Sequence, residues 1–223
     1  MEMMAHQDKQ VEELRLSNDI LSNGKALRGR IAEEGYVFLK GVMDRDKLMA
    51  LRAEMMEVLM VAGWLLEGTD PVDGIARPGV QCTEGDLEYT EVYHQLYRLE
   101  SFHRSGHWPE VMAVMEQVIG AEVLPHPQKI ARLWFPHYTE HTTPMHQDFV
   151  HFQGSFETYT FWAPVGDCPK ELGGLAVLPG SHKIGKVRDH HFSLGAGGLV
   201  VDEAGLSGTW LSTDYEAGDA LIF

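Results

Sequence analysis

The sequence predicts a mainly β domain with flanking helices, and two patterns support this prediction. Up to Gly120, apolar residues recur at the three- and four-residue spacing of amphipathic helices. After Gly120, short runs rich in β-branched and aromatic residues are separated by Pro and Gly, as in a sandwich or barrel rather than in βαβ units. The 223 residues contain no internal repeat and no linker, so we expect one domain.

The first part of the chain is predicted to be helical with one early strand. Val11–Leu16 and Ala26–Glu34 are predicted as short helices. Gly35–Lys40 is predicted as a strand because aromatic and β-branched residues follow a glycine.

A longer amphipathic helix is predicted from Arg45 to about Ala62, with Asp44 as its cap. One face of this helix is expected to be buried, and its members are Leu48, Leu51, Met55, Leu59 and Ala62. The Gly-, Asp- and Pro-rich stretch Gly63–Gly85 is expected to form loops. Trp108–Ile119 is predicted as a further helix.

The second part of the chain is predicted to contain the strands of the β domain. The predicted strands are Lys129–Phe135, Thr158–Ala163, Gly174–Leu178, Gly198–Val201 and Ala220–Phe223.

Charge and cysteine content exclude several classes of protein. The chain has 33 acidic and 18 basic side chains, a net charge of −15, and no basic cluster, so neither nucleic acid nor an anionic membrane is an expected partner. Cys82 and Cys168 stand far apart, which argues against a disulfide framework or a thiolate zinc site and favours a cytoplasmic location. The longest apolar run, Val58–Leu66, is too short to span a bilayer. The sequence leaves the oligomeric state undetermined.

His146-Gln147-Asp148 is the strongest candidate for a metal site. In a strand, residues i and i+2 point to the same face, which would place the imidazole and the carboxylate side by side. Two His and one carboxylate form the facial triad of non-haem Fe(II) oxygenases, so this motif supplies two of three ligands. A hydrogen-bonded surface pair is the alternative. His6-Gln7-Asp8 repeats the pattern in a charged stretch, and we assign it no role.

Several segments resemble the phytanoyl-CoA dioxygenase family in order and spacing. They are Glu34–Val42, His146–Phe149, Phe161–Pro164, Leu172–His182 and Tyr215–Phe223. The resemblance implies a double-stranded β-helix, or jelly roll, with a helical part over about 1–120 and the jelly-roll core over about 121–223. It implies Fe(II), 2-oxoglutarate and O2 as cofactor and co-substrates, and a small organic substrate that is hydroxylated with release of succinate and CO2.

The resemblance also implies roles for individual residues. His146 and Asp148 would be catalytic iron ligands, and the presence of the Asp148 carboxylate favours hydroxylation over halogenation. Gln128, Thr143 and Trp162 would lie against the cofactor or co-substrate, with loop capping or core packing as the alternative for each.

Other polar positions are expected to be structural. Gly173 and Gly174 suit a turn, and His182 belongs to a turn that the family shares. His137 and His141 have i, i+4 spacing, but neighbouring prolines argue against a helical zinc site there.

The family pattern places the second metal histidine, and beyond it an arginine for 2-oxoglutarate, shortly after Phe223. We therefore expect the last strands of the jelly roll beyond residue 223, so that this chain would be C-terminally incomplete; a degenerate chain, or substitution by His190 or His191, is the alternative. Two other functions stay open: a catalytically inactive jelly-roll scaffold, and a cupin-like isomerase or hydrolase using another divalent metal. The net charge of −15 argues against a coenzyme A thioester, although Lys129 or Arg132 could offset it locally.

Overall fold

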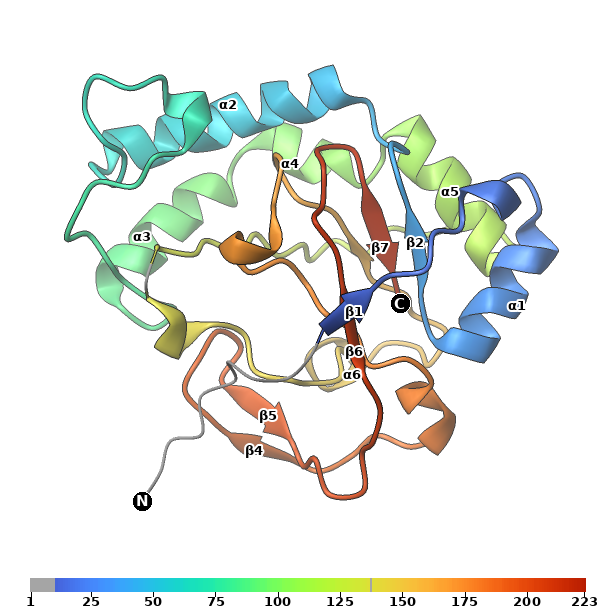
Figure 1. The fold of residues 1–223 in the computed structure, drawn as a ribbon. Helices are drawn as coiled ribbons and strands as arrows, with labels where there is room; N and C mark the ends of the chain where they lie inside the picture. The colour runs from blue at the N-terminus through green and yellow to red at the C-terminus, as the bar shows by residue number, and fades with distance from the viewer. Residues whose placement is uncertain (1–10, 137) are drawn as a thin grey trace.

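The computed structural model describes residues 11–136 and 138–223 (Figure 1). Small sheets occupy the middle and one end of the molecule, and helices from the first half of the chain cover the central sheet. Helical residues outnumber strand residues, which corrects the expectation of a mainly β chain. Over the described ranges the strands do not close into a barrel, so the jelly roll stays an implication of the family resemblance.

Three of the predicted helices form, and the cap predicted for one of them is present. The long helices of this half are α1 (Gly24–Glu34), α2 (Arg45–Val61) and α5 (Pro109–Ile119). The Asp44 side chain accepts a hydrogen bond from the Lys47 N–H and so begins α2, as predicted. Gly35 ends α1 in the left-handed conformation at φ 84°, which costs a glycine little.

The sequence analysis did not predict the helices α3 (Leu87–Leu96) and α4 (Glu100–Ser105). In α3, Tyr89, Val92 and Leu96 are buried at helical spacing, but three tyrosines within nine residues give the segment the composition of a strand. Tyr89 stacks on Tyr93, with ring centroids 6.1 Å apart, and also packs near Trp64. Burial raises the pKa of Tyr89 to about 12, so this hydroxyl is protonated at neutral pH.

The central sheet has the order β2-β7-β3 and is antiparallel throughout. Its strands are β2 (Val37–Leu39), β7 (Ala220–Ile222) and β3 (Phe161–Trp162). Every residue of β7 is fully buried, because β7 lies between two strands and beneath the helices. The predicted strands at Gly35–Lys40 and Ala220–Phe223 are confirmed, and Thr158–Ala163 is reduced to β3.

Two further sheets each contain two strands. They are β1 (Val11–Glu13) with β6 (Trp210–Ser212), which are parallel, and β4 (His190–Phe192) with β5 (Leu199–Val201), which are antiparallel. The predicted helix at Val11–Leu16 is therefore wrong, because pairing with a strand about 200 residues later overrides the local helical preference. The predicted strand at Gly198–Val201 is confirmed as β5.

Two other predicted strands do not form. Lys129–Phe135 is irregular: none of the described strands pairs with it, and Ala131 and Leu133 pack instead in the hydrophobic cluster that contains the tyrosines of α3. Gly174–Leu178 reaches a partner only in an isolated bridge between Val177 and Leu211.

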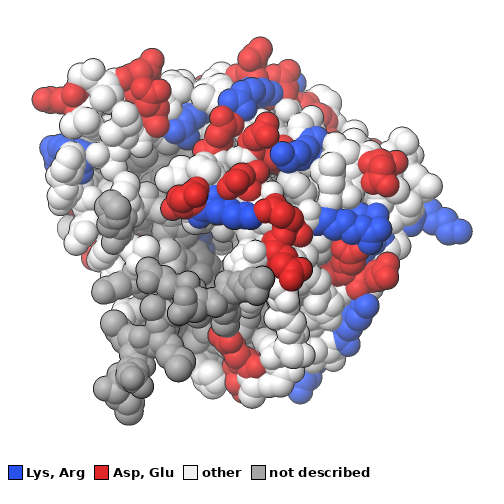
Figure 2. Space-filling model, viewed as in Figure 1, with Lys and Arg blue, Asp and Glu red and all other residues white. Residues whose placement is uncertain are grey.

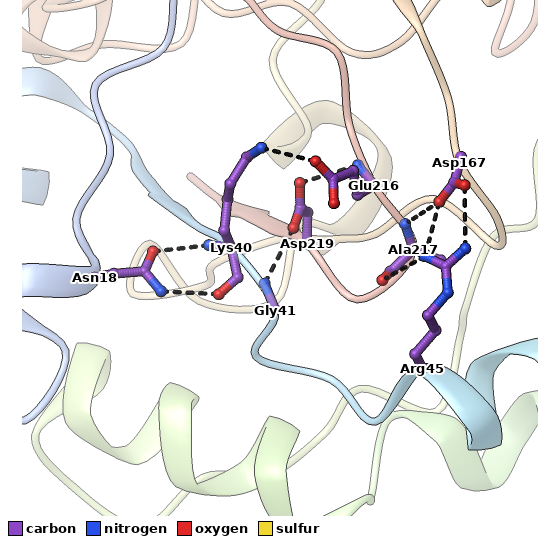
Figure 3. Close-up of polar contacts among 8 residues, drawn as sticks. All are labelled: Asn18, Lys40, Gly41, Arg45, Asp167, Glu216, Ala217 and Asp219. Atoms are coloured by element: carbon purple, nitrogen blue, oxygen red, sulfur yellow. Dashed lines mark hydrogen bonds and ion pairs between the residues drawn. The ribbon is translucent and has the colours of Figure 1, made fainter.

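A buried carboxylate ties β7 to the connection between β2 and α2 (Figure 3). Asp219 is 2% exposed, and its two oxygens accept hydrogen bonds from the Gly41 N–H and the Glu216 N–H, each at 3.0 Å. Gly218 is required beside it, since a Cβ there would lie 2.9 Å from the Met43 carbonyl oxygen at a φ of 107°. The family segment Tyr215–Phe223 thus builds a turn that holds the central strand.

A neighbouring ion pair supports the same turn from the surface. Asp167 accepts two hydrogen bonds from the Arg45 guanidinium, at 2.9 and 3.1 Å, and a third from the Ala217 N–H (Figure 3). The hydrogen bonds from Arg45 and Ala217 lower the pKa of Asp167 to about 2.

Acidic and basic side chains are intermingled over the face shown in Figure 2, so the net charge of −15 does not gather into a single acidic patch there. Ion pairs between the two kinds of side chain include Lys47–Glu110 and Arg15–Glu34. None of the helices within the described ranges is long and apolar enough to cross a membrane.

Candidate functional site

His146 and Asp148 lie on a loop immediately before the short helix α6 (Phe149–Phe152), and not on a strand as predicted. Asp148 has helical backbone angles and precedes the first turn of α6, which removes the alternation that a strand would impose. The two side chains nevertheless meet, with His146 Nε2 3.0 Å from Asp148 Oδ1. The predicted juxtaposition is therefore present, although it arises from a loop.

Neighbouring groups orient both side chains. The second ring nitrogen of His146, Nδ1, lies 2.7 Å from the Pro144 carbonyl oxygen, which acts as its acceptor. The other carboxylate oxygen of Asp148 accepts a hydrogen bond from the Thr160 hydroxyl, just before β3. Such hydrogen bonds behind a metal ligand fix its orientation. Both side chains are about one-quarter exposed, so the pair is accessible from solvent.

Hydrogen bonds stabilise the charged forms of both His146 and Asp148. The hydrogen bond to Asp148 raises the pKa of His146 against the opposing effect of burial. Burial alone would raise the pKa of Asp148, but hydrogen bonds from His146 and Thr160 outweigh it and leave this pKa below its ordinary value. Asp148 is thus an ionised carboxylate at neutral pH.

This donor set suits a divalent cation. Both ring nitrogens of His146 face acceptors, so a proton or a cation must lie between Nε2 and Asp148 Oδ1. One imidazole nitrogen and one carboxylate oxygen match the ligand preferences of Fe(II). Within residues 11–136 and 138–223 no third His, Cys, Asp or Glu completes a metal-binding group around this pair.

His190 and His191 do not supply the third ligand in this arrangement. His190 Nε2 accepts a hydrogen bond from the Gln147 N–H at 3.1 Å, and its Nδ1 lies 2.9 Å from the Arg188 carbonyl oxygen. Both ring nitrogens of His190 are therefore engaged, and His191, next along β4, is exposed. The hypothesis that one of them substitutes for the missing histidine is not supported by the structure.

Gln147 anchors the loop that carries the candidate ligands His146 and Asp148, called the metal-ligand loop below, to the segment before β4. Its side-chain oxygen accepts a hydrogen bond from the Arg188 N–H at 2.7 Å, and its amide nitrogen lies 3.4 Å from the Lys186 carbonyl oxygen. The Met145 carbonyl accepts a further bond from the Val201 N–H. The residue between the two candidate ligands thus holds them in position.

The predicted cofactor-binding residues lie in different surroundings. Trp162 is on β3 and packs edge-on against Tyr215, with ring centroids 4.8 Å apart, which fits the core-packing alternative. Thr143 is half-buried on the loop that leads to His146. Gln128 is exposed, and its backbone N–H donates to the ring of His126. A contact of these three residues with a cofactor stays a prediction.

Two of the remaining predicted positions have structural contacts. His182 lies with Nε2 3.1 Å from the Ala32 carbonyl oxygen, so the family turn docks on the end of α1. His141 packs against Tyr138, with ring centroids 4.6 Å apart. His137 and the motif His6-Gln7-Asp8 lie outside the described residues.

The structure adds residues to this region that the sequence analysis did not assign. The ring of His151 lies 5.4 Å from that of His146 and nearly perpendicular to it. Arg132 and the glycine turn at Gly197 lie beside His151. A second histidine in the stretch His146–His151 was the only local sign of this group, and its partners come from distant segments.

An open cavity of about 420 Å³ lies beside Met145, the residue before His146. It is lined by Met145, Leu178, Leu206, Trp210, Glu203, Ser207, Gly208 and Thr209. Its volume lies within the range of small-molecule sites.

Together, a helix-covered β domain and an accessible His–Asp pair define a candidate mononuclear metal site of the oxygenase type. The sequence matches the phytanoyl-CoA dioxygenase (PhyH) family over residues 31–223, and the chain belongs to this family. It is 27% identical to the 1-deoxypentalenic acid 11-beta-hydroxylases of Streptomyces arenae and Streptomyces exfoliatus, over 92% of this chain and 72% of each relative. These similarities support an oxidoreductase of the oxygenase type.

Proposed function

We propose that the protein is an Fe(II)- and 2-oxoglutarate-dependent dioxygenase that hydroxylates a small organic substrate and releases succinate and CO2. The observation that carries this proposal is the 3.0 Å approach of His146 Nε2 to Asp148 Oδ1 within a chain of the PhyH family. The names of the two Streptomyces relatives, both hydroxylases, support the reaction class. A cytoplasmic location fits the two free cysteines, Cys82 and Cys168.

The residues of this chain hold, orient and charge-balance the site. His146 and Asp148 would bind Fe(II), while Pro144 keeps the Nδ1 proton of His146 and Thr160 occupies the second oxygen of Asp148. The ionised carboxylate contributes one negative charge toward the divalent ion. With 2-oxoglutarate and O2, bound iron supplies the oxidation of an unactivated C–H bond. The cavity beside Met145 offers a volume of suitable size for a small organic molecule.

The decisive experiment measures succinate formed from 2-oxoglutarate by the full-length protein with Fe(II) and O2. We expect turnover in the wild type and none in Asp148→Ala, which removes a candidate ligand. Asp189→Ala is the matched control, because Asp189 is exposed and the hydrogen bond that its backbone carbonyl accepts from the Asp202 N–H survives the substitution. Succinate formed at the wild-type rate by Asp148→Ala would refute the assignment.

A catalytically inactive binding protein is the alternative, because the described part of the chain offers two candidate ligands and no third. An inactive binding protein would form no succinate at full length, and Asp148→Ala would leave its affinity for its partner unchanged. A cupin-like enzyme with another divalent metal predicts a metal other than iron in protein purified without added metal, and activity without O2.

A further inference from the structure

Arg132 lies on the segment that leads toward the candidate metal site, between two residues that pack in the core. Its neighbours Ala131 and Leu133 belong to the hydrophobic cluster that contains Tyr89 and Tyr93 of α3. This packing holds the chain on both sides of Arg132. Its side chain is one-quarter exposed, so it is partly desolvated and still reachable from solvent.

One carboxylate oxygen fixes the direction of the guanidinium. Arg132 Nη1 donates to Glu84 Oε2 at 2.7 Å, and the same oxygen accepts a hydrogen bond from the Gly197 N–H at 2.9 Å. Glu84 therefore joins Arg132 to the glycine turn between β4 and β5. A guanidinium carries five N–H donors in a planar fork, so this ion pair does not use up its donors.

The other arm of the fork is directed to the side of the site that holds His151. A Cβ built on Gly197 would lie 3.6 Å from Arg132 Nη2 and 3.7 Å from His151 Cε1, so both side chains border the same small space. His151 in turn lies 5.4 Å, ring to ring, from His146. Arg132, His151 and His146 thus form a row that ends at the His146–Asp148 pair.

The charge of Arg132 reaches this row. It acts to lower the pKa of both His146 and His151, which shows that the guanidinium lies within electrostatic range of the site. The acidic groups that face the row are Glu84 and Asp148, and its other titratable neighbours include His190 and the tyrosines of α3. The chain has a net charge of −15, so its overall field repels anions. A fixed cation beside the His146–Asp148 pair therefore favours binding of an anionic ligand at this one position.

We propose that Arg132 binds the carboxylate of an organic-acid ligand next to the His146–Asp148 pair, with Gly197 leaving the space and His151 lining it. The placement of this ligand beside a metal rests on the function proposed above. Arginine suits this role because its fork matches the two oxygens of a carboxylate. The carboxylate belongs either to 2-oxoglutarate or to the substrate itself, and the experiment separates these sources.

The test is calorimetric titration of the full-length protein, with and without Ni(II) as an inert metal, using three probes. The probes are 2-oxoglutarate, cyclohexanecarboxylate and the neutral cyclohexanemethanol. The variants are Arg132→Gln, Glu84→Gln and the control Lys129→Gln, which removes a cation from the same segment. Thermal melting of each variant verifies that it is folded.

We expect Arg132→Gln to weaken binding of an acid probe by about ten- to a hundredfold, the effect of losing a charge-assisted hydrogen-bond pair, and to leave the alcohol unchanged. Glu84→Gln should strengthen acid binding, because it removes the negative charge that competes for Arg132. Loss confined to 2-oxoglutarate identifies the co-substrate as the ligand, and loss confined to cyclohexanecarboxylate identifies the substrate.

A purely structural Arg132–Glu84 ion pair predicts that both substitutions act in the same direction. Equal effects of Arg132→Gln and Glu84→Gln, unchanged acid binding in Arg132→Gln, or equal loss of the alcohol would overturn the proposal. Succinate formation by the wild type is measured separately. Its absence would refute the proposed function, while Arg132-dependent acid binding in metal-free protein would still establish the carboxylate site.

Discussion

Replacement of Asp219 by alanine tests how the central strand is held. The side chain is 2% exposed and accepts hydrogen bonds from the Gly41 N–H and the Glu216 N–H. Each bond to a buried charged acceptor contributes about 1.5–3 kcal/mol, so losing both lowers the free energy of unfolding by about 3–6 kcal/mol. This is a large part of the roughly 5–15 kcal/mol that stabilises a typical domain.

Urea unfolding followed by circular dichroism measures this change through the shift in midpoint. Asp219→Asn keeps one acceptor oxygen and is expected to lose about half as much as Asp219→Ala. Asp214→Ala is the control, because Asp214 accepts a comparable backbone bond from Lys170 in an exposed position. A loss of less than about 1 kcal/mol in Asp219→Ala would refute the role of the buried carboxylate.

Three further predictions concern the metal-ligand loop, a surface ion pair and a glycine. Gln147→Ala should weaken Ni(II) binding about tenfold or more by releasing the loop, measured by calorimetry. The pKa of Asp167 is lowered to about 2, so its ion pair with Arg45 stabilises the folded protein above about pH 4, and this stabilisation is lost as the pH falls toward 2. In Asp167→Asn the melting temperature should therefore depend less on pH over this window. Gly35→Ala should destabilise by about 1–2 kcal/mol or more, because φ is 84° and the new Cβ would meet the His182 ring.

Controls for these predictions come from the same elements. Gln147→Glu keeps the acceptor for the Arg188 N–H and should retain more Ni(II) affinity than Gln147→Ala. Gly29→Ala in α1 meets nothing within 4 Å and should be neutral or stabilising. An unchanged acid transition in Asp167→Asn, or equal stability of the two glycine variants, would contradict the corresponding explanation.

Local patterns were sufficient for elements whose stability depends on neighbouring residues. The three- and four-residue spacing after Asp44 predicted α2, and the aromatic run after Gly35 predicted β2. The spacing of His146 and Asp148 predicted their contact even though the predicted strand is a loop, because two residues so close in the chain meet in either conformation. The helix α3, by contrast, was not predicted, because its tyrosines give the segment a strand-like composition. One of these tyrosines, Tyr89, packs against Trp64 in the structure.

Amino-acid sequence by itself determined the family, the Asp44 cap of α2 and the candidate ligand pair, since each depends on short stretches of chain. Tertiary structure alone decided that β1 pairs with β6, that Gln147 is anchored near β4, and that Arg132 meets Glu84 and the turn at Gly197. These contacts join residues more than forty positions apart. Their formation depends on how the whole chain packs, and local periodicity contains no information about it.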